Sequence, residues 1–138
     1  MPTTCVIGAQ RGDEGKARVV DLLAAAAVIV HFQGGSNAGH TVMFGGETYG
    51  LHPVPSGIFR AGKTCVVAHG VVLDPGVFFE EVEDLRARGH EVSGRNLMVS
   101  DRAQLVMPWH TRLARRGHPG RVRRSTEGDQ RSVSLKGT

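Results

Sequence analysis

Two glycine-rich polar loops, each directly after a short apolar run, constrain the fold of this 138-residue chain most strongly. The first apolar run covers residues 4–9 (TCVIGA) and leads into a loop at 10–15. The second covers residues 28–32 (VIVHF) and leads into a loop at 33–40. Short apolar runs bounded by turn-forming residues are typical of buried strands. The sequence therefore predicts two strands that each end in an open loop.

The rest of the chain continues this alternation of strands and helices. Apolar residues at helical spacing predict one helix over 16–25, and Asp74-Pro75 predicts the start of a second, which ends near Gly89. Further strands are expected at 64–68 and 96–100, and Gly45-Gly46 predicts a hairpin between 41–44 and 47–51. The order of elements favours an α/β fold: a mainly parallel sheet with flanking helices and a small β-hairpin.

The net charge of +4 comes from the C-terminal end of the chain. Residues 1–111 hold nine Lys and Arg against eleven Asp and Glu, whereas residues 112–138 hold eight against two. The last 27 residues contain no aromatic residue and too little apolar surface to offset the entropy of ordering. We therefore predict a domain over 1–111 and a disordered basic tail over 112–138.

Composition also narrows the class of protein. Two cysteines argue against a disulfide-stapled secreted domain, and no apolar run approaches the roughly 20 residues that a membrane span needs. A tail without aromatic residues could bind nucleic acid only through charge. We expect a cytoplasmic protein with no membrane partner and no specific nucleic-acid partner.

The first loop, Gly12-Asp13-Glu14-Gly15-Lys16, suits a phosphate group. It lies between a predicted strand and a predicted helix, where free backbone N–H groups and the helix dipole favour an anion. The spacing is not that of a Walker A loop. Asp13 and Glu14 would repel a phosphate unless a magnesium ion bridges one of them or one acts as a base. The alternative is a capped helix start with surface charges.

The second loop, at 33–41, carries groups that can read a ligand and move a proton. In a doubly wound sheet, ligands lie at the loops that follow the carboxyl ends of the strands. Asn37 can bind an amide or hydroxyl edge, and His40 can donate a proton. A lone histidine is more often structural, so this loop alone does not define a reaction.

Together these segments resemble a known family. GDEGK follows VIGAQ, and then VHFQGGSNAGHT, LHPVPSGI and DRAQLVMPWH follow in order. Over residues 4–110 the sequence resembles the N-terminal third of adenylosuccinate synthetase. The resemblance implies a P-loop-like GTP-binding fold, incomplete here, and a ligase of purine biosynthesis that joins inosine monophosphate (IMP) and L-aspartate to give adenylosuccinate. It also implies GTP as co-substrate, Mg²⁺ as cofactor and a homodimer.

The resemblance assigns roles to individual residues. Asp13 would take the proton from N1 of IMP, and His40 would be the acid that stabilises charge at O6. The Asp13 carboxylate and the Gly39 carbonyl would hold Mg²⁺. The GTP-binding residues would be Gly12, Asp13, Glu14, Gly15, Lys16, Ala17, Arg18, Gly39, His40 and Thr41. The IMP-binding residues would be Asp13, Glu14, Gly15, Lys16, Asn37, Ala38, Gly39 and His40.

The sequence also departs from the family's pattern. Arg11 stands where the family carries tryptophan, and Ala17-Arg18 stands where it carries Gly-Lys. The family's later segments for aspartate and guanine are not found, so we expect a truncated member that is inactive on its own. The alternative is a non-catalytic fragment that binds nucleotide phosphate or interacts with another chain.

The remaining polar residues are interpreted as structural. Both cysteines, Cys5 and Cys65, fall in predicted strands and are expected to be buried thiols. His31 is expected to be a satisfied core or edge residue, and His52 shows no metal-ligand spacing. The acidic residues of the second predicted helix are expected on its solvated face: Glu80, Glu81, Glu83 and Asp84.

Overall fold

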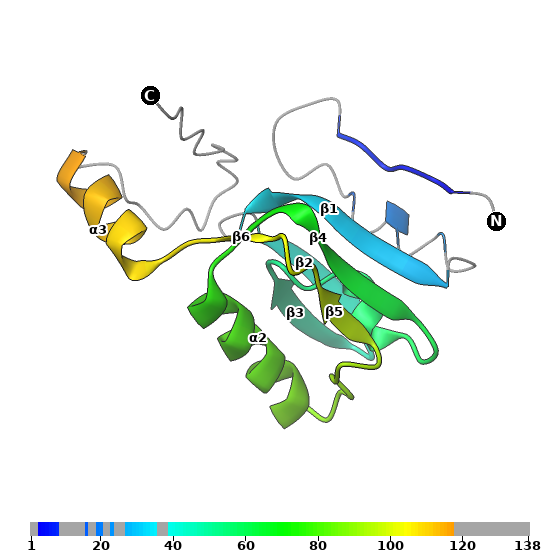
Figure 1. Cartoon of the computed structure of the whole chain (residues 1–138). Helices are drawn as coiled ribbons and strands as arrows, with labels where there is room; N and C mark the ends of the chain where they lie inside the picture. Colours follow the sequence, from blue (N-terminus) through cyan, green and yellow to red (C-terminus); the bar gives the residue numbers. More distant parts are fainter. Residues whose placement is uncertain are drawn as a thin grey trace.

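A parallel sheet forms the centre of the computed structural model, which describes residues 3–8, 16, 19–20, 23, 27–35 and 39–117. Strand β4 (Thr64–Leu73) pairs with β1 (Val28–Gly35) along most of its length (Figure 1). Strands β5 (Leu97–Val99) and β6 (Gln104–Leu105) pair with the first and last parts of β4. All of these pairings are parallel, which confirms the predicted α/β class.

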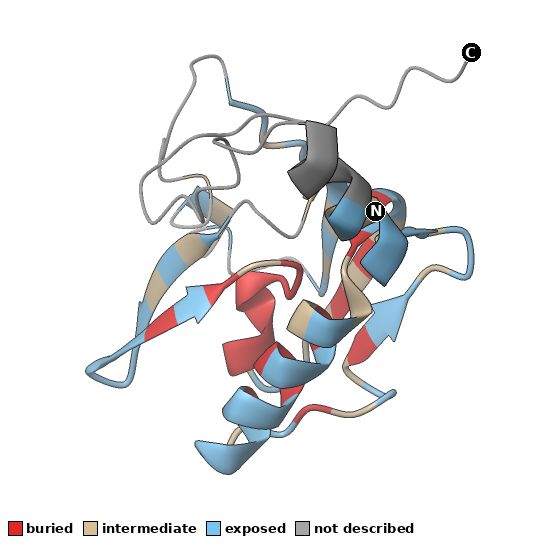
Figure 2. Cartoon of the chain, turned by 90° about the vertical axis from the view of Figure 1, so that its left-hand side faces the viewer, coloured by how far each residue is buried: buried red, intermediate tan, exposed pale blue. Residues whose placement is uncertain are grey.

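Helix α2 (Pro75–Ala87) closes the core against this sheet. Cys65 and Val67 alternate along β4 as fully buried side chains, and Val82 and Leu85 of α2 belong to the same apolar cluster. Figure 2 shows the buried residues gathered around α2, the sheet and the short helix beside them. The loops that follow the strands are thereby attached to a rigid base.

Both ends of α2 are fixed by local sequence. The Asp74 side chain accepts a hydrogen bond from the backbone N–H of Gly76 at 2.9 Å, as its predicted capping role requires. At the other end Gly89 has a positive φ of 86°, and the N–H of His90 donates to the carbonyl of Leu85. This is a Schellman motif. The predicted start and stop of the helix are confirmed.

The predicted hairpin is also confirmed. Strands β2 (His40–Phe44) and β3 (Glu47–Leu51) pair antiparallel through a two-residue turn. Gly45 and Gly46 both have positive φ, at 61° and 85°, which a type I′ turn requires and glycine adopts at little cost. The register places His40 opposite Leu51, so the far end of the hairpin adjoins the second glycine-rich loop.

The segment after β3 is buried and runs into a short 3₁₀ helix, η1 (Ser56–Phe59). Pro53 and Val54 are fully buried. A Cβ atom at Gly57 would collide with the end of the Ile29 side chain, which would have to shift, so η1 packs closely against β1 here. The segment at 52–54 lies between β1 and α2, because Pro53 accepts a hydrogen bond from His31 and Val54 donates one to Glu81.

The first predicted strand does not form. Residues 3–8 adopt no strand conformation, and Ile7 is 75% exposed. Strand formation depends on pairing and packing more than on intrinsic preference, and no described strand pairs with this apolar run. Of the helix predicted over 16–25, Lys16, Val19 and Val20 have helical backbone and Leu23 does not, and the other residues lie outside the described ones.

Helix α3 (Pro108–Gly117) was not predicted. Proline occupies its first position, which suits a helix start, and the ring of His110 accepts a hydrogen bond from the backbone N–H of Met107 at 3.0 Å. These capping signals were overlooked because the chain after His110 contains few apolar residues. The helix crosses 111/112, the predicted boundary between domain and tail; that division stays a prediction.

Candidate functional site

The predicted site residues fall only partly within the described residues. Lys16 is half-buried and helical, Gly39 directly precedes β2, and His40 and Thr41 begin that strand. The distance between Asp13 and His40 stays untested, since Asp13 lies outside the described residues. The other predicted site residues that lie outside them are Gly12, Glu14, Gly15, Ala17, Arg18, Asn37 and Ala38.

The prediction of a loop over 33–41 is wrong at its ends, because residues 33–35 extend β1 and pair with β4, and His40 and Thr41 begin β2. The loop leaves the carboxyl end of β1, beside the carboxyl end of β4, with Gly35 in register with Val72. The loop returns at Gly39, and His40 then enters the hairpin. Ligands of open α/β sheets bind at this edge.

His31 contacts Gly34 near the end of β1, within the stretch that was predicted as a loop. Its Nδ1 lies 3.1 Å from the carbonyl oxygen of Pro53, and since a carbonyl only accepts, Nδ1 donates. Its Nε2 lies 2.9 Å from the point where a Cβ atom at Gly34 would stand. Gly34 also has φ +148°, which side-chain-bearing residues rarely adopt. The expectation of a satisfied histidine is confirmed.

His52 lies against the end of the same loop. Its Nε2 is 3.0 Å from the position that a Cβ atom at Gly39 would occupy. Its Nδ1 is 3.5 Å from a carboxylate oxygen of Glu81, and the ring is 42% exposed. The ring therefore lies between the residue that precedes His40 and an acidic group on α2.

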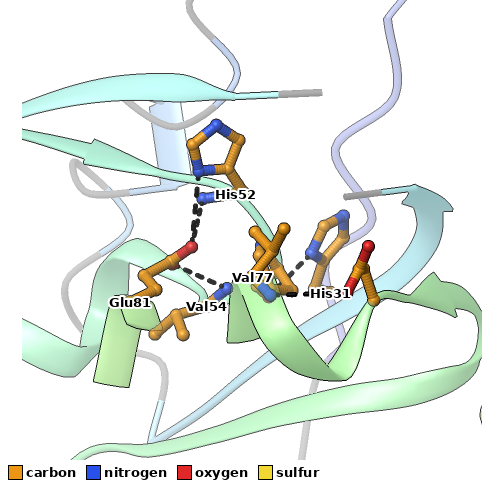
Figure 3. A network of polar contacts seen from close by, with 7 residues as sticks. His31, His52, Val54, Val77 and Glu81 are labelled. Carbon is orange, nitrogen blue, oxygen red and sulfur yellow. Dashed lines mark hydrogen bonds and ion pairs between the residues drawn. The ribbon is translucent and has the colours of Figure 1, made fainter. Parts of the chain in front are cut away.

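The expectation that Glu81 faces solvent is wrong, because its side chain is only 7% exposed. Its carboxylate accepts hydrogen bonds from the backbone N–H groups of His52 at 3.0 Å and Val54 at 3.2 Å (Figure 3). Burial raises the pKa of Glu81 to about 7, and the two backbone donors oppose part of that rise. Glu81 thus joins α2 to the segment after β3.

Sequence spacing could have revealed this position. Glu81 follows the buried Phe78 by three residues and precedes the buried Leu85 by four, so it falls on the same helical stripe. The spacing was overlooked because Glu81 stands among other acidic residues of the helix, which were assigned together to its solvated face. Nothing in the local sequence identified the contact of His52 with Gly39, because it joins two segments through the hairpin.

The predicted magnesium ligands have the chemistry that suits a hard divalent cation, and their geometry stays a prediction. Carboxylate and carbonyl oxygens, as predicted for Asp13 and Gly39, are the ligands that Mg²⁺ prefers. Within the described ranges, no group of three or more His, Cys, Asp and Glu residues could hold a metal ion. The same residues include no helix long and apolar enough to cross a bilayer.

Comparison with known proteins decides the family. A family model described as adenylosuccinate synthetase matches residues 5–127. The chain belongs to the adenylosuccinate synthetase family. The synthetase of Oleidesulfovibrio alaskensis is 54% identical over 114 residues, and that of Myxococcus xanthus is 53% identical over the same length. The match covers 82% of this chain and about 27% and 26% of those two proteins.

Solved structures of similar enzymes support the same family assignment. The fully ligated adenylosuccinate synthetase of Plasmodium falciparum superposes with a TM-score of 0.70 at 29% identity, covering 81% of this chain and 26% of that one. The succinoaminodeoxyadenylate synthetase of cyanophage S-2L, bound to dGMP and dATP, gives 0.60 at 26% identity, covering 78% and 30%. The chain therefore corresponds to an N-terminal portion of an adenylosuccinate synthetase with its P-loop-type fold.

Proposed function

We propose that this chain carries the proton-transfer and triphosphate-binding part of a site that ligates IMP and L-aspartate at the expense of GTP. Asp13 takes the proton from N1 of IMP, so that O6 can attack the γ-phosphorus of GTP. L-aspartate then displaces the 6-phosphoryl group, giving adenylosuccinate, GDP and phosphate. His40 stabilises the charge that develops at O6 and on the phosphoryl group. The family membership is the observation that carries this proposal.

The chemistry of the chain supports these roles. Phosphoryl transfer depends mainly on positioning and on neutralising spread charge, which backbone N–H groups, a lysine and a metal ion can supply. Lys16 provides the main charge beside the phosphates, with Gly12 to Arg18 lining them. Asp13 and Gly39 would hold Mg²⁺, which neutralises phosphate charge when bound. A homodimer and a cytoplasmic setting belong to the same proposal.

A chimeric enzyme tests these assignments. The matched N-terminal segment of the Myxococcus xanthus synthetase is replaced by the corresponding residues of this chain. We expect adenylosuccinate formation from IMP, GTP, Mg²⁺ and L-aspartate, and a loss of about 10²–10⁴-fold in kcat for Asp13→Asn and for His40→Asn. Glu83→Gln, on the exposed side of α2, serves as the control and should leave kcat unchanged. An active Asp13→Asn chimera would exclude Asp13 as the base.

A second candidate is a non-catalytic unit that binds nucleotide phosphate or another polypeptide. It is favoured by a row of exposed apolar side chains on alternate residues of β1, namely Val28, Val30 and Phe32. Parallel sheets are usually covered on both faces, so such a face suits a protein contact. The chimeric enzyme, incubated with IMP, GTP, Mg²⁺ and L-aspartate, separates the two candidates, because a non-catalytic unit would leave the chimera inactive. Measurable adenylosuccinate would eliminate the non-catalytic one.

A further inference from the structure

We infer that His31, His52 and Glu81 form a clamp that packs against Gly34, near the end of β1, and against Gly39, just before β2, and thereby places Gly39 and His40 for the ligand. This inference deepens the proposed function and rests on it for the identity of the ligand, a metal-bound nucleoside triphosphate. The three residues are positioning residues, because none is placed in contact with substrate.

The first arm of the clamp is His31. It projects from β1, three residues before Gly34, and its ring contacts the position where a Gly34 side chain would begin. Its other ring nitrogen donates to the carbonyl of the buried Pro53. One side of the imidazole therefore fixes the ring, and the other side packs against the last part of β1, where Gly34 pairs with Val71 of β4.

The second arm is His52, which acts where the chain enters β2. The pairing of His40 with Leu51 brings the next residue, His52, beside Gly39. The ring packs close to the Gly39 backbone, with its Nε2 3.0 Å from the Cβ position. Movement of Gly39 in that direction is blocked as long as the ring stays in place.

Glu81 and the segment at 52–54 join the two arms. The carboxylate holds the backbone N–H groups of His52 and Val54, and it also lies near the His52 ring. Pro53, between those two residues, accepts the hydrogen bond from His31. Figure 3 shows His31 and Glu81 beside the segment at 52–54, of which His52 and Val54 are labelled. A single buried carboxylate on α2 therefore supports both arms of the clamp.

Such an arrangement limits motion at the site without touching the ligand. Catalytic and binding groups need to be held within about 0.5 Å by neighbours that are themselves fixed. Gly34 is held by its pairing with β4, whereas Gly39 lies outside the strands and has no side chain that could anchor it. The clamp supplies the missing constraint from outside, through rings that occupy the space beside each glycine.

Backbone ¹⁵N relaxation of the 138-residue chain tests the clamp. In the unaltered chain we expect order parameters of Gly39 and His40 near the rigid value of about 0.85. His52→Ala removes the ring but leaves the backbone hydrogen bonds to Glu81, and it should lower both order parameters below about 0.6. Glu81→Gln should act in the same direction, and Glu83→Gln, an exposed position on the same helix, should change neither.

The same samples separate the clamp from the proposed function. Titration with Mg²⁺ and GTP should give a dissociation constant about tenfold higher for His52→Ala than for the unaltered chain, equivalent to about 1.4 kcal/mol. Unchanged order parameters at Gly39 and His40 in His52→Ala would overturn the clamp, and so would a decrease spread over β4 and α2. A local decrease with no binding of GTP by the unaltered chain would support the clamp and overturn the proposed ligand.

Discussion

The carboxylate of Glu81, on α2, accepts a hydrogen bond from the backbone N–H of His52, 29 residues earlier in the chain, at 3.0 Å. The same carboxylate accepts from Val54. The bonds tie a helix on one side of the core to the segment that follows the hairpin. Because His40 pairs with Leu51, the residue before His52, this tie lies beside a predicted site residue.

Replacing Glu81 tests how much this tie stabilises the fold. Glu81→Ala leaves two backbone N–H groups without their acceptor, one of them on the fully buried Val54. An unsatisfied buried donor costs about 1–3 kcal/mol, so the free energy of unfolding should fall by at least that amount in urea denaturation. Glu83→Ala, at an exposed position two residues on, should change it by less than about 0.5 kcal/mol. Equal effects of the two variants would refute the buried role.

A double-mutant cycle tests the contact between His52 and Gly39. Gly39→Ala places a methyl group 3.0 Å from His52 Nε2, so either the ring or the loop must move, and the variant should be destabilised. His52→Ala removes the obstacle, so the double variant should recover much of the loss. We expect a coupling of about 0.5–3 kcal/mol in the free energy of unfolding. Additive effects would indicate that the two residues do not touch.

The cysteines should differ in reactivity and in their effect on pH-dependent stability. Cys5 is exposed, contrary to the prediction, and should react rapidly with iodoacetamide, whereas Cys65 is fully buried, as predicted. Burial raises the pKa of the Cys65 thiol from 9.0 to about 11. Between these pH values the unfolded chain loses this proton first, so the free energy of unfolding should fall as pH rises.

A matched variant isolates that effect. Other groups titrate in the same range, but Cys65→Ala lacks the thiol, so the difference in pH dependence between the two proteins reports Cys65 alone. The difference should have a slope of at most about 1.4 kcal/mol per pH unit between pH 9 and 11. Parallel curves would show that the Cys65 thiol ionises equally in both states.

Local signals were sufficient for much of the fold. The two glycines of the hairpin, the Asp74 cap and Gly89 each act within a few residues, and each forms the predicted structure. The apolar run at 4–9 was a weaker signal, because a strand also needs a partner that the run itself does not specify. Helix α3 begins at a proline signal that the scarcity of apolar residues concealed.

The sequence assigns roles to the residues of the candidate site, which stay predictions, but it did not predict the contacts that position them. The motifs at 12–16 and 37–40 are contiguous in sequence, so their resemblance to a family could assign roles directly. The clamp combines β1, the segment at 52–54 and α2, and the hydrogen bonds that join these parts span 22 to 29 residues. Such long-range contacts follow from the register of the hairpin and the packing of α2, which composition and periodicity do not determine.

The central claim is that the two glycine-rich loops converge on one metal-bound triphosphate. Mn²⁺ accepts the same oxygen ligands as Mg²⁺ and broadens the NMR signals of nearby nuclei, so a titration of ¹⁵N-labelled chain with Mn²⁺ and GTP tests the claim directly. We predict selective broadening of the amide signals of residues 12–18 and 39–41, abolished by Asp13→Asn. Broadening at only one of the two loops, or equal broadening in Asp13→Asn, would contradict the account.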